Sequence, residues 1–158
     1  MTPLAVWRIC YNGNLNLASL AYGSTLGPGR WHLAPPMGLP VVYAASSRAL
    51  AQLEKRVHAN SVAPVRQALI RLEMPTGAIA LDAEADLALQ TPKWKDDEGY
   101  TQGIGTQWLN SKASLGLWVP SIVEPQERNL LINPAHPHYS AITVAVEVID
   151  FEFDPRLF

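Results

Sequence analysis

The sequence predicts an α+β fold in one domain, residues 1–158, with mixed or antiparallel sheets and a few short helices. Thirteen prolines and ten glycines are spread along the chain and separate short apolar runs. The segment 48–59 follows two serines that can cap a helix. The segment 142–148 alternates apolar and polar residues, which is typical of a half-buried strand. Strand signals outnumber helix signals.

The composition is that of a globular domain with a sizeable core. The chain has 158 residues, close to the ~100–150 residues of a common domain. Apolar residues make up 48% and charged residues 16%, which excludes intrinsic disorder. A formal net charge of −2 gives no general attraction to phosphate backbones or anionic lipids. We therefore expect no direct nucleic-acid binding and no membrane binding.

Cys10 is the single cysteine, so no intrachain disulfide and no cysteine-based zinc site can form. The segment 1–10 lacks the basic and apolar regions of a secretory signal. No apolar run reaches the ~18 residues of a membrane-spanning helix. These features predict a cytoplasmic protein, with Cys10 as a small buried residue.

The helix signals are fewer than the strand signals. Ser46 or Ser47 is the expected N-cap of a helix over 48–59. A second helix over 101–111 begins poorly because of its glycines. The segments 23–40 and 91–100 have the composition of loops, and 11–20 is ambiguous.

The expected strands are short. The segments 68–72 and 78–81 are separated by a proline–glycine turn, which predicts a hairpin or a sheet edge. The complete set of expected strands is 4–10, 41–44, 68–72, 78–81, 115–119, 128–132 and 142–148.

Glu54 is the most informative charged residue. On a helical wheel it lies about 40° from the centre of the stripe formed by Leu50, Leu53 and Val57, on the buried side. An unpaired carboxylate there would be costly, so either a cation reaches it or it lines a pocket that a ligand fills. The alternative is that Glu54 forms a structural ion pair, or that it lies at the solvent-exposed border of the stripe.

Arg30 and Tyr43 are two further candidates. Arg30 follows Gly27-Pro-Gly, where glycines allow close approach of a ligand and a guanidinium can grip phosphate or carboxylate. The spacing matches neither a P-loop nor a dinucleotide-binding fingerprint. Arg30 could equally be tied to backbone carbonyls, and Tyr43, at the end of an apolar strand, could be a core aromatic.

Ser121 and two histidines carry weaker signals. Ser121 lacks the Gly-x-Ser-x-Gly elbow of a hydrolase nucleophile, and its ordinary reading is a turn or capping serine. His136 and His138 could hold a metal, but no third ligand at suitable spacing is visible, so we expect a surface loop and no metal.

In their order along the chain, eight short stretches resemble the RES domain, a family named for an arginine, a glutamate and a serine. The resemblance covers nearly the whole chain. The stretches are WRI at 7–9, GPGRW at 27–31, VVYA at 41–44, ALAQLE at 49–54, GTQWL at 105–109, VPS at 119–121, NLLINP at 129–134 and FDPRL at 153–157.

This resemblance implies a fold and an activity. RES domains are toxins of type II toxin–antitoxin systems, and their fold resembles that of the ADP-ribosyltransferases. The implied chemistry is cleavage of the nicotinamide–ribose bond of NAD, with water or phosphate as acceptor. NAD is then the substrate, and no cofactor or metal is implied. The alternative within the enzyme class is a protein ADP-ribosyltransferase that uses NAD as donor.

The resemblance also implies residue roles. Glu54 would stabilise the cationic ribose, and Arg30 would hold the pyrophosphate or a ribose-side oxygen. Tyr43 would shape the nicotinamide pocket, and Ser121 would hydrogen-bond near the ribose or carboxamide. The further substrate-binding candidates are Arg8 as a second phosphate ligand, Trp31, His58, which could orient Glu54 from one helical turn away, and Asn133.

The implied partner is an antitoxin with an Xre-type helix-turn-helix domain, which would supply any contact with DNA. A homodimer or a larger toxin–antitoxin assembly is also expected. A third hypothesis is a catalytically inert module that acts only through its partner, with Glu54 in a structural ion pair.

Overall fold

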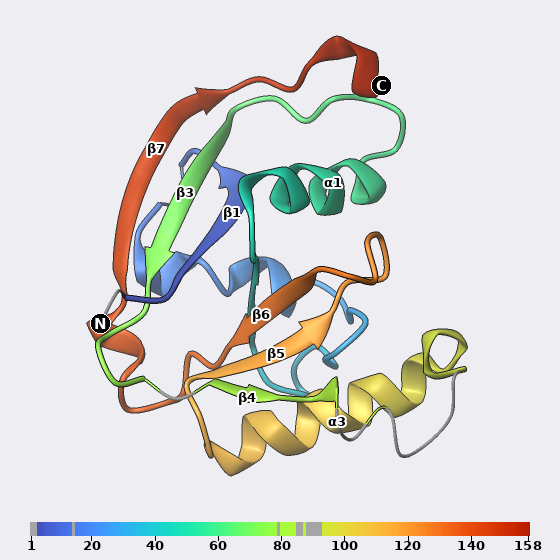
Figure 1. Cartoon of the computed structure of the whole chain (residues 1–158), viewed down its shortest axis with the longest axis vertical. Coiled ribbons are helices and arrows are strands. Elements are labelled where there is room, and N and C mark those ends of the chain that lie inside the picture. Colours follow the sequence, from blue (N-terminus) through green and yellow to red (C-terminus); the bar gives the residue numbers. More distant parts are fainter. Residues whose placement is uncertain (1–2, 14, 79, 85–86, 88–92) are drawn as a thin grey trace.

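A computed structural model describes residues 3–13, 15–78, 80–84, 87 and 93–158. It contains one seven-stranded sheet with the strand order β4-β5-β6-β2-β1-β3-β7 (Figure 1). Only β4 and β5 pair in parallel, and the other neighbours are antiparallel. The predicted α+β class with a mixed sheet is confirmed. The strands are β1 (Ala5–Tyr11), β2 (Val42–Ala45), β3 (Gln67–Glu73), β4 (Ala80–Asp82), β5 (Gly116–Pro120), β6 (Arg128–Ile132) and β7 (Thr143–Phe151).

The sheet opens in its middle. β1 pairs with β3 along its whole length, from Ala5 to Tyr11, but with β2 only at Trp7 and Ala45. β2 instead pairs with β6 along its whole length. The sheet therefore consists of two halves, β2-β6-β5-β4 and β1-β3-β7, which separate beyond Trp7 (Figure 1).

The helix α1 (Arg48–His58) follows β2 and contacts both β1 and β2. Ser47 caps it by accepting a hydrogen bond from the Leu50 amide, as predicted. The predicted apolar stripe is wrong, because Leu53 and Val57 are 40% and 55% exposed. Leu50 and Ala51 form the buried face instead. The helix is thus turned so that residues 51, 54 and 55 face the opening in the sheet.

The helix α3 (Glu98–Ser111) lies along the half of the sheet that contains β4 and β5 (Figure 1). It begins three residues before the predicted start, because Asp97 accepts a hydrogen bond from the Tyr100 amide. Part of the predicted loop 91–100 is therefore helical, and residues 91 and 92 lie outside the described residues. A Cβ at Gly105 would overlap the carbonyl oxygen of Trp31, so this glycine lets α3 approach the loop before β2.

Of the two arrangements predicted for the segments 68–72 and 78–81, the structure has the sheet edge. β3 and β4 do not form a hairpin: β3 lies between β1 and β7, and β4 is a sheet edge beside β5, in line with the edge alternative. The alternating segment 142–148 became β7, an edge strand that leaves Val146 and Ile149 about half exposed, at 46% and 53%. Ile142 is buried but precedes the strand.

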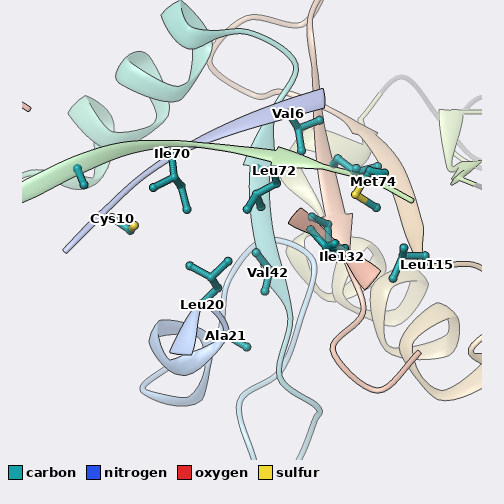
Figure 2. Packing of buried hydrophobic residues seen from close by; sticks show 14 residues of the cluster. Val6, Cys10, Leu20, Ala21, Val42, Ile70, Leu72, Met74, Leu115 and Ile132 are labelled. Carbon is teal, nitrogen blue, oxygen red and sulfur yellow. The ribbon is translucent and has the colours of Figure 1, made fainter. Parts of the chain in front are cut away.

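The largest hydrophobic cluster packs on one face of the sheet and joins its two halves (Figure 2). Val6 and Cys10 of β1, Ile70 and Leu72 of β3, and Ile132 of β6 contribute to it. The expected burial of Cys10 is confirmed, at 6% exposure. In the described part of the chain, no helix is both long and apolar enough to cross a membrane.

Candidate functional site

A cavity of about 740 Å³ lies where the two halves of the sheet separate. This volume is within the range of roughly 300–1,000 Å³ common for ligand sites. Side chains from β1, from the loop before β2, from β2, α1 and β6 line it. It brings together six of the eight predicted site residues: Arg8, Arg30, Trp31, Tyr43, Glu54 and His58.

The Glu54 carboxylate is held by two hydrogen bonds. Ser121 Oγ lies 2.8 Å and Asn129 Nδ2 lies 2.6 Å from the same atom, Glu54 Oε1. Among the residues that the structure describes, no group donates a hydrogen bond to Glu54 Oε2. One carboxylate oxygen is therefore fixed, while the other is available to a ligand in the cavity.

Ser121 is fully buried and reaches the site only through Glu54. Its Oγ accepts hydrogen bonds from the amides of Val123 and Glu124, at 3.1 and 3.0 Å. The hydroxyl has a single proton, which is thus directed to the glutamate. Ser121 is not among the residues that line the cavity, and its hydroxyl holds the Glu54 carboxylate.

Tyr43 and His32 form a second hydrogen-bonded pair in the wall of the cavity. The Tyr43 hydroxyl lies 2.6 Å from His32 Nδ1, and His32 Nε2 lies 2.9 and 3.1 Å from the carbonyls of Ser24 and Gly27. Carbonyl oxygens only accept, which assigns the proton of the neutral imidazole to Nε2. Nδ1 then accepts the hydrogen bond that the Tyr43 hydroxyl donates.

Burial is the main reason that the pKa of Tyr43 is raised above its ordinary value. The hydrogen bond from the Trp31 amide opposes this shift, and the charge of Glu98 adds to it. Tyr43 therefore stays protonated at neutral pH and keeps donating to His32. Its ring is held in place at the cavity wall.

Arg30 extends from a loop that α3 holds in place. Thr101 Oγ1 donates to the Arg30 carbonyl at 2.6 Å, and Gln102 Nε2 donates to the Gly29 carbonyl at 2.9 Å. The Arg30 Nη1 atom donates to the Lys95 carbonyl. Because this is the one hydrogen bond described for the guanidinium, its other donors are available to an anion in the cavity.

A side chain at position 29 would crowd the His32–Tyr43 pair. A Cβ there would lie 2.9 Å from both His32 Nδ1 and the Tyr43 hydroxyl. The glycine thus lets the loop pack closely against the His32–Tyr43 pair.

Arg8 lines the cavity, but its Nη atoms bind backbone. Nη1 donates to the Tyr43 carbonyl at 2.7 Å and Nη2 to the Leu20 carbonyl at 3.2 Å. Burial lowers its pKa from the ordinary value, although a guanidinium remains charged at neutral pH. Arg8 bridges the opening between the sheet halves through these hydrogen bonds to backbone carbonyls.

Two predicted contacts need correction. His58 contacts Glu54 as expected for residues four apart, but its Nδ1 lies 2.9 Å from the Glu54 backbone carbonyl and does not orient the carboxylate. Asn133 is buried outside the cavity, where it donates to the Leu109 carbonyl and accepts from the Ala135 amide. Asn133 follows the last residue of β6. It is four residues after Asn129, which corresponds to roughly 13 Å along an extended chain.

The sequence interpretation missed Asn129 and His32. Asn129 is a polar residue in a strand whose next three residues are all buried and apolar, which is a usable signal for a functional side chain. His32 has no comparable signal beyond its place in the glycine-rich loop. Within the described part of the chain, no three His, Cys, Asp or Glu side chains are grouped to hold a metal.

Comparison with known proteins agrees with this description. The model of the RES domain family matches residues 5–154. The chain is 40% identical to the Prs ADP-ribosylating toxin of a Sphingobium species, over 96% of this chain and 94% of that protein. It is 35% identical to Toxin Res of Yersinia enterocolitica, over 98% and 99% of the two chains.

A solved structure has the same fold. A chain from the crystal structure of the Mycobacterium tuberculosis MbcT–MbcA toxin–antitoxin complex superposes with a TM-score of 0.67 and 19% identity, covering 99% of this chain and 87% of that one. With the family model matching almost the whole sequence, the chain belongs to the RES domain family.

Proposed function

We propose that this RES domain is a toxin of a toxin–antitoxin system that cleaves the nicotinamide–ribose bond of NAD. The observation that supports this proposal most is the Glu54 carboxylate, held at Oε1 by Ser121 and Asn129 and free at Oε2, in a cavity of about 740 Å³. The toxin names of the curated relatives and the toxin–antitoxin origin of the structural neighbour agree with it.

The reaction breaks the bond between ribose C1″ and the nicotinamide nitrogen. The bonding electron pair leaves with the nicotinamide, which neutralises its positive ring, so no proton has to be supplied to the leaving group. Positive charge develops on the ribose, and Glu54 Oε2 would stabilise it or grip a ribose hydroxyl. Water, which loses a proton to solvent as it adds, or phosphate then forms the new bond to C1″.

The other residues would bind and orient the dinucleotide. Arg30 would hold the pyrophosphate or a ribose-side oxygen with its remaining donors. Tyr43, fixed by His32, would shape the nicotinamide pocket, and Trp31 and His58 would form part of the wall. Ser121 and Asn129 would position Glu54.

The first test compares the wild type with Glu54→Gln. Purified proteins are incubated with NAD, with and without phosphate, and nicotinamide is quantified by chromatography. We expect the substitution to lower nicotinamide release by about 100-fold or more, because it removes the charge that stabilises the transition state. Glu152→Gln, at an exposed glutamate, is the matched control. Equal release by wild type and Glu54→Gln would overturn the proposal.

Protein ADP-ribosylation is the second candidate, because the relative from Sphingobium is named an ADP-ribosylating toxin. The steps up to the cationic ribose are shared, and only the acceptor differs. Incubation of the enzyme with labelled NAD and a cell extract distinguishes the two. Label on a discrete protein, absent with Glu54→Gln, supports transfer, whereas turnover of NAD without labelled protein contradicts it.

We also propose an antitoxin with an Xre-type helix-turn-helix domain as partner, supported by the neighbour from a toxin–antitoxin complex. Co-expression with the product of an adjacent reading frame of that type should yield a stable complex and restore growth. Separate elution of the two proteins at micromolar concentration would contradict this. The mass of the eluted species also tests the expected homodimer or larger assembly.

A further inference from the structure

Glu98, the first residue of α3, is a second carboxylate in the wall of the large cavity. Glu54 lies on α1 and Glu98 at the start of α3, and these two helices lie on opposite sides of β5 and β6 (Figure 1). Apart from histidines, the described charged residues that line the cavity are Arg8, Arg30, Glu54 and Glu98. Of these, Glu98 has no part in the proposed cleavage.

The Glu98 carboxylate uses little of its capacity to accept hydrogen bonds. Its one described side-chain contact is with Gln102 Nε2, which lies 3.4 Å from Glu98 Oε1, beyond the usual hydrogen-bond distance, and donates to the Gly29 carbonyl at 2.9 Å. Arg30 lines the same cavity, yet no salt bridge is described for Glu98 or for Arg30. Both charges are therefore available to a ligand.

Helix capping does not account for Glu98. Asp97 already caps α3, because its carboxylate accepts a hydrogen bond from the Tyr100 amide. A negative charge near the start of a helix is stabilised by the helix dipole, and Asp97 supplies that charge as well. The position of Glu98 in the cavity wall is thus better explained by a ligand than by the stability of α3.

The two neighbouring hydroxyl groups of a ribose suit such a carboxylate. Each hydroxyl can donate one hydrogen bond, and an ionised carboxylate only accepts. A phosphate on one of these hydroxyls removes a donor and adds about −1.5 to −2 of charge, which the carboxylate repels. NAD and NADP differ by one such phosphate, on the 2′ hydroxyl of the adenosine ribose. A carboxylate at this ribose therefore favours NAD.

We propose that Glu98 binds the hydroxyl groups of the adenosine ribose of NAD and excludes the 2′-phosphate of NADP. Glu98 is thus a specificity-determining residue. The inference rests on the proposed function, in which Glu54 acts at the nicotinamide ribose and Arg30 can hold the pyrophosphate that joins the two riboses. Because the two glutamates come from helices on opposite sides of β5 and β6, each carboxylate faces one ribose of the dinucleotide.

The first test measures kcat/KM for NAD and for NADP by nicotinamide release. We expect the wild type to prefer NAD by about 100-fold or more, and Glu98→Gln to reduce this preference at least about tenfold, mainly through a gain with NADP. Asp96→Asn is the matched control, because it removes the charge of an exposed side chain that does not line the cavity. It should keep the preference of the wild type.

The ratio of the two kcat/KM values separates a role in specificity from a structural role. Damage to α3 alone would lower cleavage of both dinucleotides by a similar factor. The Glu98 side chain is exposed and α3 keeps its Asp97 cap, so the urea unfolding midpoint of Glu98→Gln should stay close to that of the wild type. If this variant does not fold, Glu98→Ser replaces it with the same expectations. Equal cleavage of NAD and NADP by the wild type, or an unchanged preference in the variant, would overturn the inference.

A binding measurement separates this inference from the proposed function. Isothermal titration with ADP-ribose and with its 2′-phosphate derivative requires no bond cleavage. We expect the wild type to bind ADP-ribose at least about tenfold more tightly than the derivative, and Glu98→Gln to lose most of this difference. This result without any NAD cleavage would contradict the proposed reaction and support the role of Glu98. NAD cleavage with equal binding of the two compounds would leave the reaction standing and overturn the role of Glu98, as would failure of the wild type to bind either compound.

Discussion

At the scale of single residues, the two asparagines of β6 and its following loop have opposite expected roles. Asn129→Ala removes a hydrogen bond that fixes Glu54 Oε1, so we expect nicotinamide release to fall about tenfold or more, mainly in kcat. Asn133→Ala leaves the buried Leu109 carbonyl and the part-buried Ala135 amide without their partner, so it should cost about 1–3 kcal/mol of unfolding free energy.

Kinetics and urea denaturation of both asparagine variants check this pair of expectations. Asn133→Ala should keep a kcat close to that of the wild type at a temperature where it is folded. A kcat effect of Asn133→Ala as large as that of Asn129→Ala would mean that our assignment of the two residues is wrong.

His32 and Tyr43 should behave as one unit. His32→Leu leaves the Tyr43 hydroxyl and the carbonyls of Ser24 and Gly27 without a partner, so it should destabilise the protein by about 1–3 kcal/mol and lower kcat. In the Tyr43→Phe background the same change should have a smaller effect on kcat, with a coupling energy of about 0.5–3 kcal/mol. A double-mutant cycle on kcat measures this energy, and purely additive effects would show that His32 does not act through Tyr43.

At the scale of elements, two glycines of α3 make opposite predictions although both lie within a helix. Gly103→Ala meets no atom within 4 Å, so it should stabilise the protein by roughly 0.5–1 kcal/mol through helix propensity. Gly105→Ala would collide with the Trp31 carbonyl and force α3 away from the loop that carries Arg30. It should lower both stability and NAD cleavage.

Urea unfolding midpoints and nicotinamide release measure the effects of these glycine substitutions. Alanine has the same intrinsic helix propensity at both positions. The difference in stability between the two variants therefore measures the effect of the close approach of α3 to Trp31. Equal stabilisation by both substitutions would show that α3 can shift away from Trp31 without loss.

At the scale of the whole molecule, the site depends on the opening between the two halves of the sheet, while stability depends mainly on the core that joins them. Expression of the wild type should therefore arrest growth, and Glu54→Gln should abolish the arrest while leaving the melting temperature nearly unchanged, because its amide oxygen can still accept from Ser121 and Asn129. Growth curves and thermal unfolding check this. A sharp fall in melting temperature with unchanged growth arrest would favour the third hypothesis, an inert module with a structural glutamate.

Much of the fold was predictable from local physics. The cap of α1 and the short apolar strands depend on neighbouring residues alone, which is why the positions of α1, β1, β2, β5 and β6 agree with the sequence prediction to within about two residues. The order of the eight short stretches along the chain was also sufficient to indicate the family. The family in turn indicated four candidate catalytic residues: Arg30, Tyr43, Glu54 and Ser121. The adjacency of β4 to β5 was not predictable, because strand order depends on contacts between residues far apart in the sequence.

Only the tertiary structure decided how these residues act. The helical wheel placed Glu54 on the buried side for the wrong reason, since its partners are Ser121 and Asn129 and its neighbours Leu53 and Val57 are exposed. Ser121 acts through the carboxylate, and Asn133 lies outside the cavity. Residue types and their order are properties of the sequence. Which atom donates to which across more than sixty residues of chain depends on the register of the sheet and the rotation of α1.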